Sequence, residues 1–240
     1  SGSLRRLLAR RFADEGLPAD PDQILLTPSG TQALDLVCRL LLRPGDAVLV
    51  DDPCYFNFQA LLKAHQARIV GVPFTESGPD TAAFAEAIAT HAPRLYITNS
   101  GPHNPTGATL SPQTAHRVLK LAAAHDLVVV EDDIFAGFET DLSPRLAALD
   151  GLDRVIRIGS FSKTLSASIR CGYVAARPDW TESLVDLQLA TNFWRASRSA
   201  KTWCSPRATS SARHRAKPAS CGSTSARWGT GGCTRCWGRG

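Results

Sequence analysis

The sequence predicts an α/β fold with a mainly parallel sheet that is covered by helices on both faces. Short runs rich in Val, Ile and Leu alternate along the chain with longer segments whose apolar residues recur at helical spacing. This alternation is typical of consecutive βαβ units. The runs are apolar at nearly every position, as expected of strands that are buried on both sides. The pattern therefore predicts a three-layer αβα architecture.

The expected elements follow one another in chain order. The first helix, residues 4–15, has apolar residues at helical spacing and is closed by Gly16 and Pro18. Strands are expected at 24–27, 47–50, 68–73, 94–98, 127–130, 155–158 and 172–176, because each is a short apolar run bounded by turn formers. Further helices are expected at 33–41, 56–65, 81–91, 112–125 and 180–189, where the apolar spacing is again helical.

Composition and charge narrow the class of protein. The 240 residues are 43% hydrophobic, enough for a sizeable core. The sequence has no apolar run of membrane-spanning length, and its first residues lack a signal peptide. We therefore expect a cytoplasmic protein that does not contact a membrane. The net charge of +5 comes from the end of the chain, because residues 193–240 hold ten Lys or Arg and no Asp or Glu. The first 192 residues have a net charge of −5, so we expect no nucleic-acid binding by this chain.

The segment 193–240 differs in kind from the 192 residues before it. It has no Leu, Ile or Val and cannot build an aliphatic core. An arginine-rich RNA- or DNA-binding tail is one alternative, and a zinc site is another, formed by Cys204, Cys221, Cys233 and Cys236. The favoured hypothesis is a change of reading frame in a GC-rich gene, which replaces the native sequence. Residues 1–192 are accordingly expected to form one domain.

A reactive lysine is expected after the strand at 155–158. Lys163 stands in the sequence Ser160-Phe161-Ser162-Lys163, and an amine at a strand end can form a Schiff base with a carbonyl cofactor. Arg170 offers a planar donor fork suited to phosphate, and the hydroxyls of Ser160 and Ser162 can add hydrogen bonds. The group predicts a phosphorylated aldehyde cofactor. The alternative is an ordinary surface loop.

A second phosphate contact is expected where the strand at 24–27 turns into a helix. Gly30, Thr31 and Gln32 stand at the start of that helix. A helix N-terminus presents free N–H groups and a positive dipole end to an anion. An ordinary helix cap is the alternative.

An aromatic ring and an amide follow two other strands. Tyr55 comes soon after the strand at 47–50. It could lie against a planar cofactor or only pack against the head of the next helix. Asn104 precedes Pro105, which favours an extended backbone with the amide projecting toward a phenolate oxygen.

Three consecutive carboxylates, Glu131, Asp132 and Asp133, follow the strand at 127–130. They repel one another unless a cation is near. A protonated ring nitrogen could supply that cation, and a bound metal ion is the alternative. Every candidate site residue is expected just past the C-terminal end of a strand, so that all of them face one crevice.

Five motifs together resemble the large domain of fold-type I pyridoxal-phosphate enzymes, the class I/II aminotransferases. In this sequence they are Ser29-Gly30-Thr31-Gln32, Pro53-x-Tyr55, Asn104-Pro105-Thr106-Gly107, Glu131-Asp132-Asp133 and Ser160-x-Ser162-Lys163. The resemblance covers residues 17–192. The chain is most similar to the 2-aminoadipate/kynurenine-type aminotransferases and to the aminotransferase-like domain of MocR-type regulators.

The resemblance implies roles for individual residues and an aspartate-aminotransferase-type fold. Lys163 would hold pyridoxal phosphate as an internal aldimine and later act as the general acid and base. Asp132 would bind the pyridinium nitrogen, Asn104 would donate to the ring oxygen and Tyr55 would stack on the ring. The phosphate would be held by Gly30, Thr31, Gln32, Ser160, Ser162 and Arg170.

The chain also departs from the family pattern. Ile134 and Phe135 stand where the family usually has a tyrosine that donates to the ring oxygen. No residue after 192 aligns with the arginine that grips the substrate carboxylate in the family's small domain, and we expect no winged-helix domain among the residues before 17.

The resemblance implies an aminotransferase that moves an amino group between an amino acid and a 2-oxo acid, with a homodimer as its working form. The alternatives are a cofactor-binding sensor domain of a transcription regulator and an inactive truncated fragment.

Overall fold

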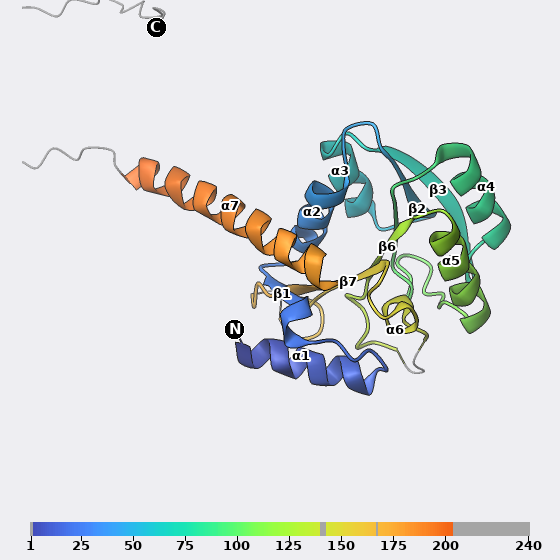
Figure 1. Ribbon diagram of the computed structural model, residues 1–240, viewed down its shortest axis with the longest axis horizontal. Coiled ribbons are helices and arrows are strands. Elements are labelled where there is room, and N and C mark those ends of the chain that lie inside the picture. Colours follow the sequence, from blue (N-terminus) through green and yellow to red (C-terminus); the bar gives the residue numbers. More distant parts are fainter. Residues whose placement is uncertain (1, 140–142, 167, 204–240) are drawn as a thin grey trace, which may run out of the picture. The chain divides into compact units, whose positions relative to one another are not determined.

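A single mixed sheet with helices on both faces forms the core of the protein (Figure 1). The computed structural model describes residues 2–139, 143–166 and 168–203. The strands are β1 (Ile24–Thr27), β2 (Ala47–Asp52), β3 (Arg68–Thr75), β4 (Gly78–Pro79), β5 (Leu95–Thr98), β6 (Val128–Asp132), β7 (Val155–Ser160) and β8 (Gly172–Ala175). The helices are α1 (Gly2–Asp14), the 3₁₀ turn η1 (Pro21–Gln23), α2 (Gly30–Leu41), α3 (Phe56–Ala64), α4 (Thr81–His91), α5 (Pro112–Ala124), α6 (Leu146–Asp150) and α7 (Pro178–Trp203).

The strand order is β1-β8-β7-β6-β5-β2-β3-β4. Strands β7, β6, β5, β2 and β3 are parallel, whereas β8 is antiparallel to both of its neighbours. Because β8 reverses direction and β1 reverses it again, β1 runs the same way as β7. One edge of the sheet therefore gathers the C-terminal ends of these strands and the N-terminal end of β8.

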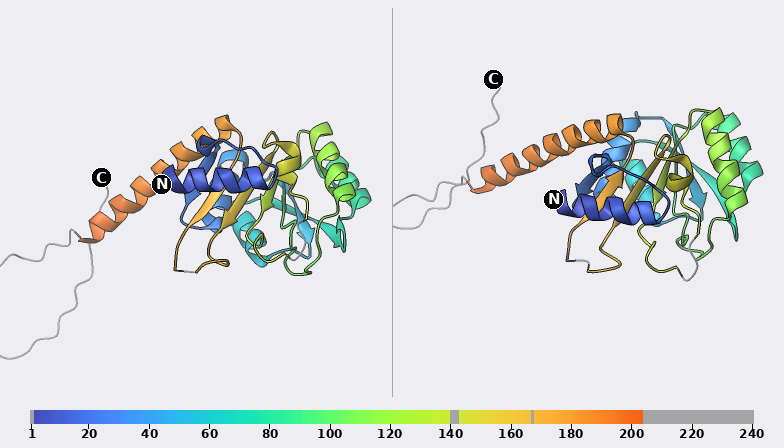
Figure 2. Two further views of the ribbon diagram at one scale, coloured as in Figure 1. Left: turned by 90° about the horizontal axis from the view of Figure 1, so that it is seen from below. Right: turned by 60° about the horizontal axis from the view of Figure 1, so that its bottom comes forward.

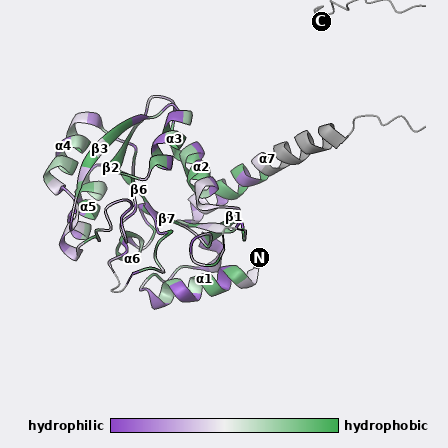
Figure 3. Cartoon of the chain, turned by 180° about the vertical axis from the view of Figure 1, so that it is seen from behind, coloured by the Kyte–Doolittle hydropathy of each residue, from purple (hydrophilic) through white to green (hydrophobic). Residues whose placement is uncertain are grey.

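Two hydrophobic clusters, one on each face, hold the three layers together. Alternate strand residues belong to different clusters: Leu49 and Val129 pack on the face of α1, α4, α5 and α6, and Val50 and Val130 pack on the face of α2, α3 and α7. This alternation is the period of two that a strand imposes on its side chains. Two further views show α1 and α7 on opposite sides of the sheet (Figure 2). The strands are mainly hydrophobic, whereas the helices that cover them also carry hydrophilic residues (Figure 3). The predicted αβα arrangement is confirmed.

The helices begin where short polar side chains accept their first N–H groups. Ser29, Asp80 and Ser111 cap α2, α4 and α5 in this way. Pro112 then occupies the first turn of α5, where its missing N–H is not needed. These caps explain why the predicted helix boundaries in this part of the chain are close to the observed ones.

Several boundaries and placements differ from the sequence-based expectation. Strands β6 and β7 continue to Asp132 and Ser160, because both residues pair with a neighbouring strand. These two residues are therefore the last residues of strands and not the first residues past them. Arg170 does not follow a strand; it precedes β8. It still lies at the same edge of the sheet, because β8 is antiparallel to β7.

The last helix is longer than expected. α7 runs through the predicted end at 189 and the predicted domain boundary at 192/193. Between Asp179 and Trp203 the sequence has neither Pro nor Gly, so no residue breaks the helix. The chain separates into two units at Ser199/Ala200. Most of the segment 193–240, including the four cysteines considered for zinc, lies outside the described residues. Within the described ranges, none of the helices has the length and hydrophobicity needed to cross a membrane.

Candidate active site

The N-terminus of α2 lies directly against the end of β7. Ser29 Oγ accepts a hydrogen bond from Gln32 N at 3.1 Å, and the Ser29 carbonyl accepts one from Ala33 N at 3.0 Å. A Cβ atom on Gly30 would lie 3.5 Å from Ser160 Cβ. Since helical geometry leaves the first N–H groups without an intrahelical acceptor, those of Gly30 and Thr31 remain available for an anion beside Ser160.

Gly172 allows this close approach. A Cβ atom at this position would lie 2.7 Å from the Ser29 carbonyl carbon, 2.8 Å from Gly30 N and 2.9 Å from Gly159 O. All three are backbone atoms, which cannot move aside as a flexible side chain could. The start of α2 and the ends of β7 and β8 therefore meet backbone to backbone, and only glycine fits at position 172.

A cavity of about 420 Å³ opens beside the start of α2. Its walls include Thr31, Gln32 and Arg170, together with Pro28, Ser29, Asp35 and Leu61. The structure thus places Arg170, which precedes β8, beside the N-terminus of α2. A helix N-terminus, hydroxyl groups and an arginine fork are the donors that bind phosphate in proteins.

Asp35 is an acidic group in the wall of this cavity, but its charge is compensated. Its carboxylate is 2.8 Å from Arg39 Nε and 2.8 Å from His65 Nε2. Burial disfavours the charge, yet the hydrogen bonds from Arg39 and His65 outweigh burial and hold the pKa of Asp35 below its usual value. The carboxylate consequently does not oppose an anion as an isolated charge would.

The lysine turn follows β7. Ser160 Oγ donates to Ser162 Oγ at 3.0 Å and accepts from Ser162 N at 3.2 Å. Phe161 O accepts from Leu165 N at 2.9 Å, so residues 161–165 form a turn in which Lys163 is exposed. A Cβ atom on Gly137 would lie 3.0 Å from Thr164 Cγ2. The turn that carries Lys163 therefore lies next to the segment that follows Asp132.

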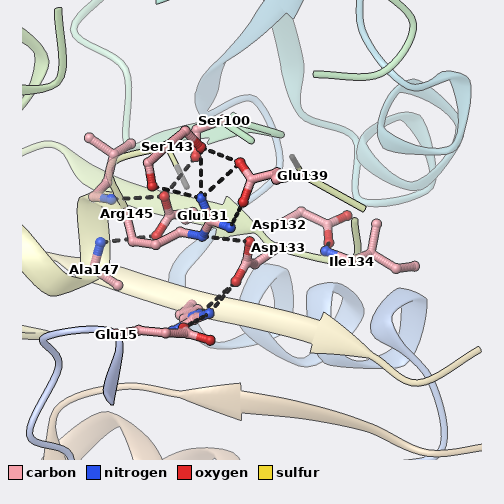
Figure 4. A network of polar contacts seen from close by, with 12 residues as sticks. Glu15, Ser100, Glu131, Asp132, Asp133, Ile134, Glu139, Ser143, Arg145 and Ala147 are labelled. Carbon is pink, nitrogen blue, oxygen red and sulfur yellow. Dashed lines mark hydrogen bonds and ion pairs between the residues drawn. The ribbon is translucent and has the colours of Figure 1, made fainter. Parts of the chain in front are cut away.

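The pleat of β6 separates the three carboxylates. Glu131 accepts hydrogen bonds from Ser100 Oγ at 2.6 Å, Leu146 N at 2.8 Å and Ala147 N at 3.0 Å (Figure 4). These partners lie on the α6 face of the sheet. Asp132 must point to the opposite face, on which α2 packs, because successive strand residues alternate.

Asp133 is paired with two arginines. Its Oδ1 lies 2.9 Å from Arg145 Nε, and its Oδ2 accepts from Arg157 Nε at 2.9 Å. Arg157 Nη2 also contacts Glu15 Oε2 at 2.5 Å. Burial is the largest influence on Asp133 and outweighs the two arginines, so that its pKa is raised to about 6.

Asp132 has no such compensation. Its Oδ1 accepts from Ile134 N at 3.2 Å, and in the described part of the chain no ion pair includes this carboxylate. Burial, with a smaller contribution from the neighbouring Asp133 charge, raises the pKa of Asp132 to about 7. A buried carboxyl of this kind is ready to accept a cation or a hydrogen-bond donor.

Tyr55 and Asn104 follow the neighbouring strands β2 and β5. Tyr55 is half-buried at the start of α3, with its ring edge-on to Phe58 at 5.7 Å and its hydroxyl accepting from Asn57 Nδ2 at 2.8 Å. Tyr55 therefore does pack against the head of α3. Asn104 is half-buried in a turn closed by a hydrogen bond from Gly107 N to His103 O at 2.7 Å.

The sequence-predicted residues fall into three groups. Gly30, Thr31, Gln32, Ser160, Ser162 and Arg170 come together around the start of α2. Lys163 and Asp132 lie on adjoining segments, and Tyr55 and Asn104 follow the next strands along the same edge. Two residues that contact these groups were not predicted as site residues from the sequence. Gly172 was expected only as the first residue of the strand at 172–176, and Asn99, which donates to the Asp132 carbonyl at 2.9 Å, has no distinctive sequence signal.

Comparison with known proteins identifies the family. The family model for aminotransferase class I and II matches residues 1–212. The chain belongs to the class I and II aminotransferase family. The resemblance stated from the sequence motifs is thereby confirmed.

Relatives of this aminotransferase-family chain include enzymes and regulators. A 2-aminoadipate transaminase of Thermus thermophilus is 34% identical over 181 residues, which is 73% of this chain and 46% of that protein. The uncharacterized HTH-type transcriptional regulator YdcR of Escherichia coli is 31% identical over 73% of this chain and 38% of that protein. The chain thus spans less than half the length of these two relatives.

A solved structure confirms the predicted aspartate-aminotransferase-type fold. LysN, an α-aminoadipate aminotransferase of Thermus thermophilus complexed with N-(5'-phosphopyridoxyl)-L-leucine, matches with a TM-score of 0.73 and 31% identity. The match covers 80% of this chain and 49% of that chain.

Proposed function

We propose that this chain binds pyridoxal 5'-phosphate and that its native protein transfers an amino group between an amino acid and a 2-oxo acid. The observation that carries the proposal is the meeting of Gly30 with Ser160, beside a cavity whose wall includes Arg170. A phosphate requires several donors at one point, and these residues come from distant parts of the sequence. Family membership and the phosphopyridoxyl ligand named for LysN support the choice of cofactor.

The donor set matches a phosphate ester. The N–H groups of Gly30 and Thr31 and the side chain of Gln32 would bind phosphate oxygens at the positive end of α2. The hydroxyls of Ser160 and Ser162 and the guanidinium of Arg170 would complete the shell. Gly172 lets these donors come together, because any side chain there would meet the backbone of Ser29, Gly30 and Gly159.

The buried carboxyl of Asp132 also fits the cofactor. It lies on the α2 face of the sheet without an ion pair within the described ranges, and its pKa is raised to about 7. A protonated pyridine nitrogen would supply the missing cation. The charge of Asp132 would then hold that proton on the nitrogen, while Asn104 and Tyr55 would orient the ring.

Lys163 would perform the proton transfers. Pyridoxal phosphate, when bound, supplies the electron sink that stabilises negative charge on the substrate's α-carbon. Lys163 lies in an exposed turn beside the segment that follows Asp132, so its Nζ can reach a ligand at this edge of the sheet. The Nζ would hold the cofactor at its carbonyl carbon and, as a neutral amine, would be the base for the proton on the substrate's Cα.

Borohydride trapping tests the proposal. The purified chain is titrated with pyridoxal phosphate, its absorption spectrum is recorded before and after borohydride, and the modified peptide is identified by mass spectrometry. We expect a visible band that borohydride removes, with the label on Lys163. Lys120→Ala, an exposed lysine on α5, is the matched control and should behave like the unaltered chain. The absence of a band, or an unchanged label pattern in Lys163→Ala, contradicts cofactor binding at this site.

A second candidate function is effector sensing without turnover, as favoured by the relative described as a transcriptional regulator. The two functions differ after the band has formed. An aminotransferase converts the band to that of the amine form when an amino acid is added, and a 2-oxo acid restores it. A sensor forms the band and does not complete this cycle. An inactive fragment, the third alternative, forms no trapped product.

We also propose a homodimer, because the family resemblance implies active sites completed by a second subunit. Light scattering at several concentrations measures the mass directly. A mass of about 52 kDa, twice the 25.8 kDa of the chain, is expected from this proposal. A monomer at every concentration contradicts it.

A further inference from the structure

The segment 99–101, which leads to Asn104, is attached to the end of β6 by consecutive contacts. Asn99 Nδ2 donates to the Asp132 carbonyl at 2.9 Å, and Ser100 Oγ donates to Glu131 Oε1 at 2.6 Å. Gly101 is buried, and a Cβ atom there would lie 2.2 Å from Ser143 Oγ, so a side chain at this position would displace the side chains packed beneath it. The position of Asn104 therefore depends on what lies beneath Gly101.

Arg145 lies beneath Gly101. Its side chain is 6% exposed, and a Cβ atom on Gly101 would lie 2.9 Å from Arg145 Nη1. The same guanidinium pairs through Nε with Asp133 and through Nη2 with Glu139, and it donates to Ser143 Oγ at 2.7 Å (Figure 4). Arg145 thus pairs with the residue after Asp132 and lies close to Gly101 in the segment that leads to Asn104.

Stability alone is a weak explanation for this buried group. Removing two ions from water is costly, and well-packed apolar residues often replace a buried ion pair without loss of stability. A guanidinium, however, has five donors in a rigid plane and can fix several acceptors in one geometry. That property suits a residue that sets the spacing between two segments.

We propose that Arg145 is a positioning residue for the cofactor site: it fixes the Asn104 segment against the end of β6 and so sets the spacing between the Asn104 amide and the Asp132 carboxylate. The inference rests on the proposed function, since both groups are there assigned to one cofactor ring. Arg145 itself would not touch the ligand. Its effect on binding would pass through Asn104.

The test uses Arg145→Met, Arg145→Lys and Gly101→Ala, with Arg154→Met as the matched control. Arg154 forms an exposed ion pair with Asp126 at 2.6 Å, just before the start of β7 and remote from Gly101. Pyridoxal-phosphate affinity is measured by titration of the absorption band. We expect Arg145→Met and Gly101→Ala to weaken binding by about 10- to 100-fold, the size of effect that loss of outer-shell partners has at metal sites. Arg145→Lys keeps the charge without the fork and should lie between Met and the unaltered chain, while Arg154→Met should bind normally.

A double-mutant cycle with Asn104→Ala separates positioning from a general loss of structure. If Arg145 acts through Asn104, then Arg145→Met weakens binding much less when Asn104 is already absent. Full additivity of the two substitutions, or normal affinity of Arg145→Met, overturns the inference. Circular dichroism verifies that each variant is folded, and Gly101→Ala remains as a test if Arg145→Met does not fold.

Hydrogen exchange of the cofactor-free chain keeps this inference distinct from the proposed function. The amides of residues 99–107 should lose protection in Arg145→Met and retain it in Arg154→Met. If the unaltered chain fails to bind pyridoxal phosphate, the proposed function fails. The exchange result still shows whether Arg145 holds residues 99–107 against the end of β6. Equal protection of residues 99–107 in both variants would show that Arg145 does not hold the segment.

Discussion

Gly30 of α2 and Ser160 of β7 face each other so closely that a Cβ atom on Gly30 would lie 3.5 Å from Ser160 Cβ. The contact joins the first βα turn of the sheet to the strand before the lysine turn. It is possible because β1 and β7 run in the same direction, with only β8 between them. Gly172 of β8 completes the arrangement. The consequences can be measured residue by residue.

Gly172→Ala should be far more damaging than Gly30→Ala. The new methyl group at position 172 meets backbone atoms at 2.7–2.9 Å, whereas the one at position 30 makes an ordinary contact at 3.5 Å. Overpacking against backbone costs about 1–3 kcal/mol, so Gly172→Ala should lower the free energy of unfolding by that amount and weaken pyridoxal-phosphate binding. Chemical denaturation of both variants checks this. Equal stabilities would mean that the backbone at this point yields easily.

The stability of the cofactor-free chain should fall as the pH rises from about 5 to about 7. Burial raises the pKa of Asp132 to about 7, above the ordinary value of 3.8, so the folded chain binds this proton more tightly than the unfolded chain does. The contribution is therefore fully present at low pH and is lost as the pH rises through the folded pKa. Asp133, whose pKa is raised to about 6, acts in the same direction.

Asp132→Asn isolates the contribution of this one carboxyl. Asparagine cannot ionise, so the variant should lose much of the decline in unfolding free energy between pH 5 and pH 7 and keep the part that belongs to Asp133. Denaturant titrations at several pH values measure the slope for both proteins. An identical slope in the variant would show that the Asp132 carboxyl does not titrate in this window.

Glu131→Gln should destabilise the fold and loosen α6. Glu131 is buried and accepts hydrogen bonds from Ser100 Oγ and from the N–H groups of Leu146 and Ala147. A side-chain amide turned toward these donors leaves at least one of them without an acceptor, at a cost of about 3 kcal/mol. Glu182→Gln, on the exposed side of α7, is the matched control and should lie within about 0.5 kcal/mol of the unaltered chain. Denaturation curves distinguish the two, and equal midpoints would refute the role of Glu131.

Cys38 should be the least reactive cysteine of the described part of the chain. It is fully buried in α2, and burial together with the Asp35 charge raises the pKa of its thiol to about 12. Cys54 and Cys171 are half-buried, so they should react first with iodoacetamide. Peptide mass spectrometry with and without denaturant follows each site. Labelling of Cys38 in the folded chain at the rate of Cys54 would contradict this order.

Much of the fold could be predicted from the pattern of apolar residues. Strands with side chains buried on both faces appear as uninterrupted runs, and the caps Ser29, Asp80 and Ser111 mark helix starts. The short elements η1, β4 and α6 were not predicted, because they contain too few residues for a period to be recognised. The helix expected at 180–189 continues to Trp203, because no Pro or Gly interrupts it.

The sequence predicts which residue types the site contains, but not which groups each of them contacts. Three consecutive carboxylates are plain in the sequence. The pleat of β6 and the position of α6 determine that Glu131 caps a helix, that Asp133 pairs with arginines and that Asp132 has no ion pair within the described ranges. Similarly, nothing local in the sequence shows that Arg145 lies under Gly101.

By itself, the sequence determined the αβα architecture and the chemistry available at one edge of the sheet, because periodicity and motifs are local properties of the chain. The tertiary structure alone decided that Arg170 reaches this edge by preceding an antiparallel strand, and that Gly30, Ser160 and Gly172 meet. Strand order and direction depend on pairing between residues far apart in the chain. No single segment of sequence contains that information.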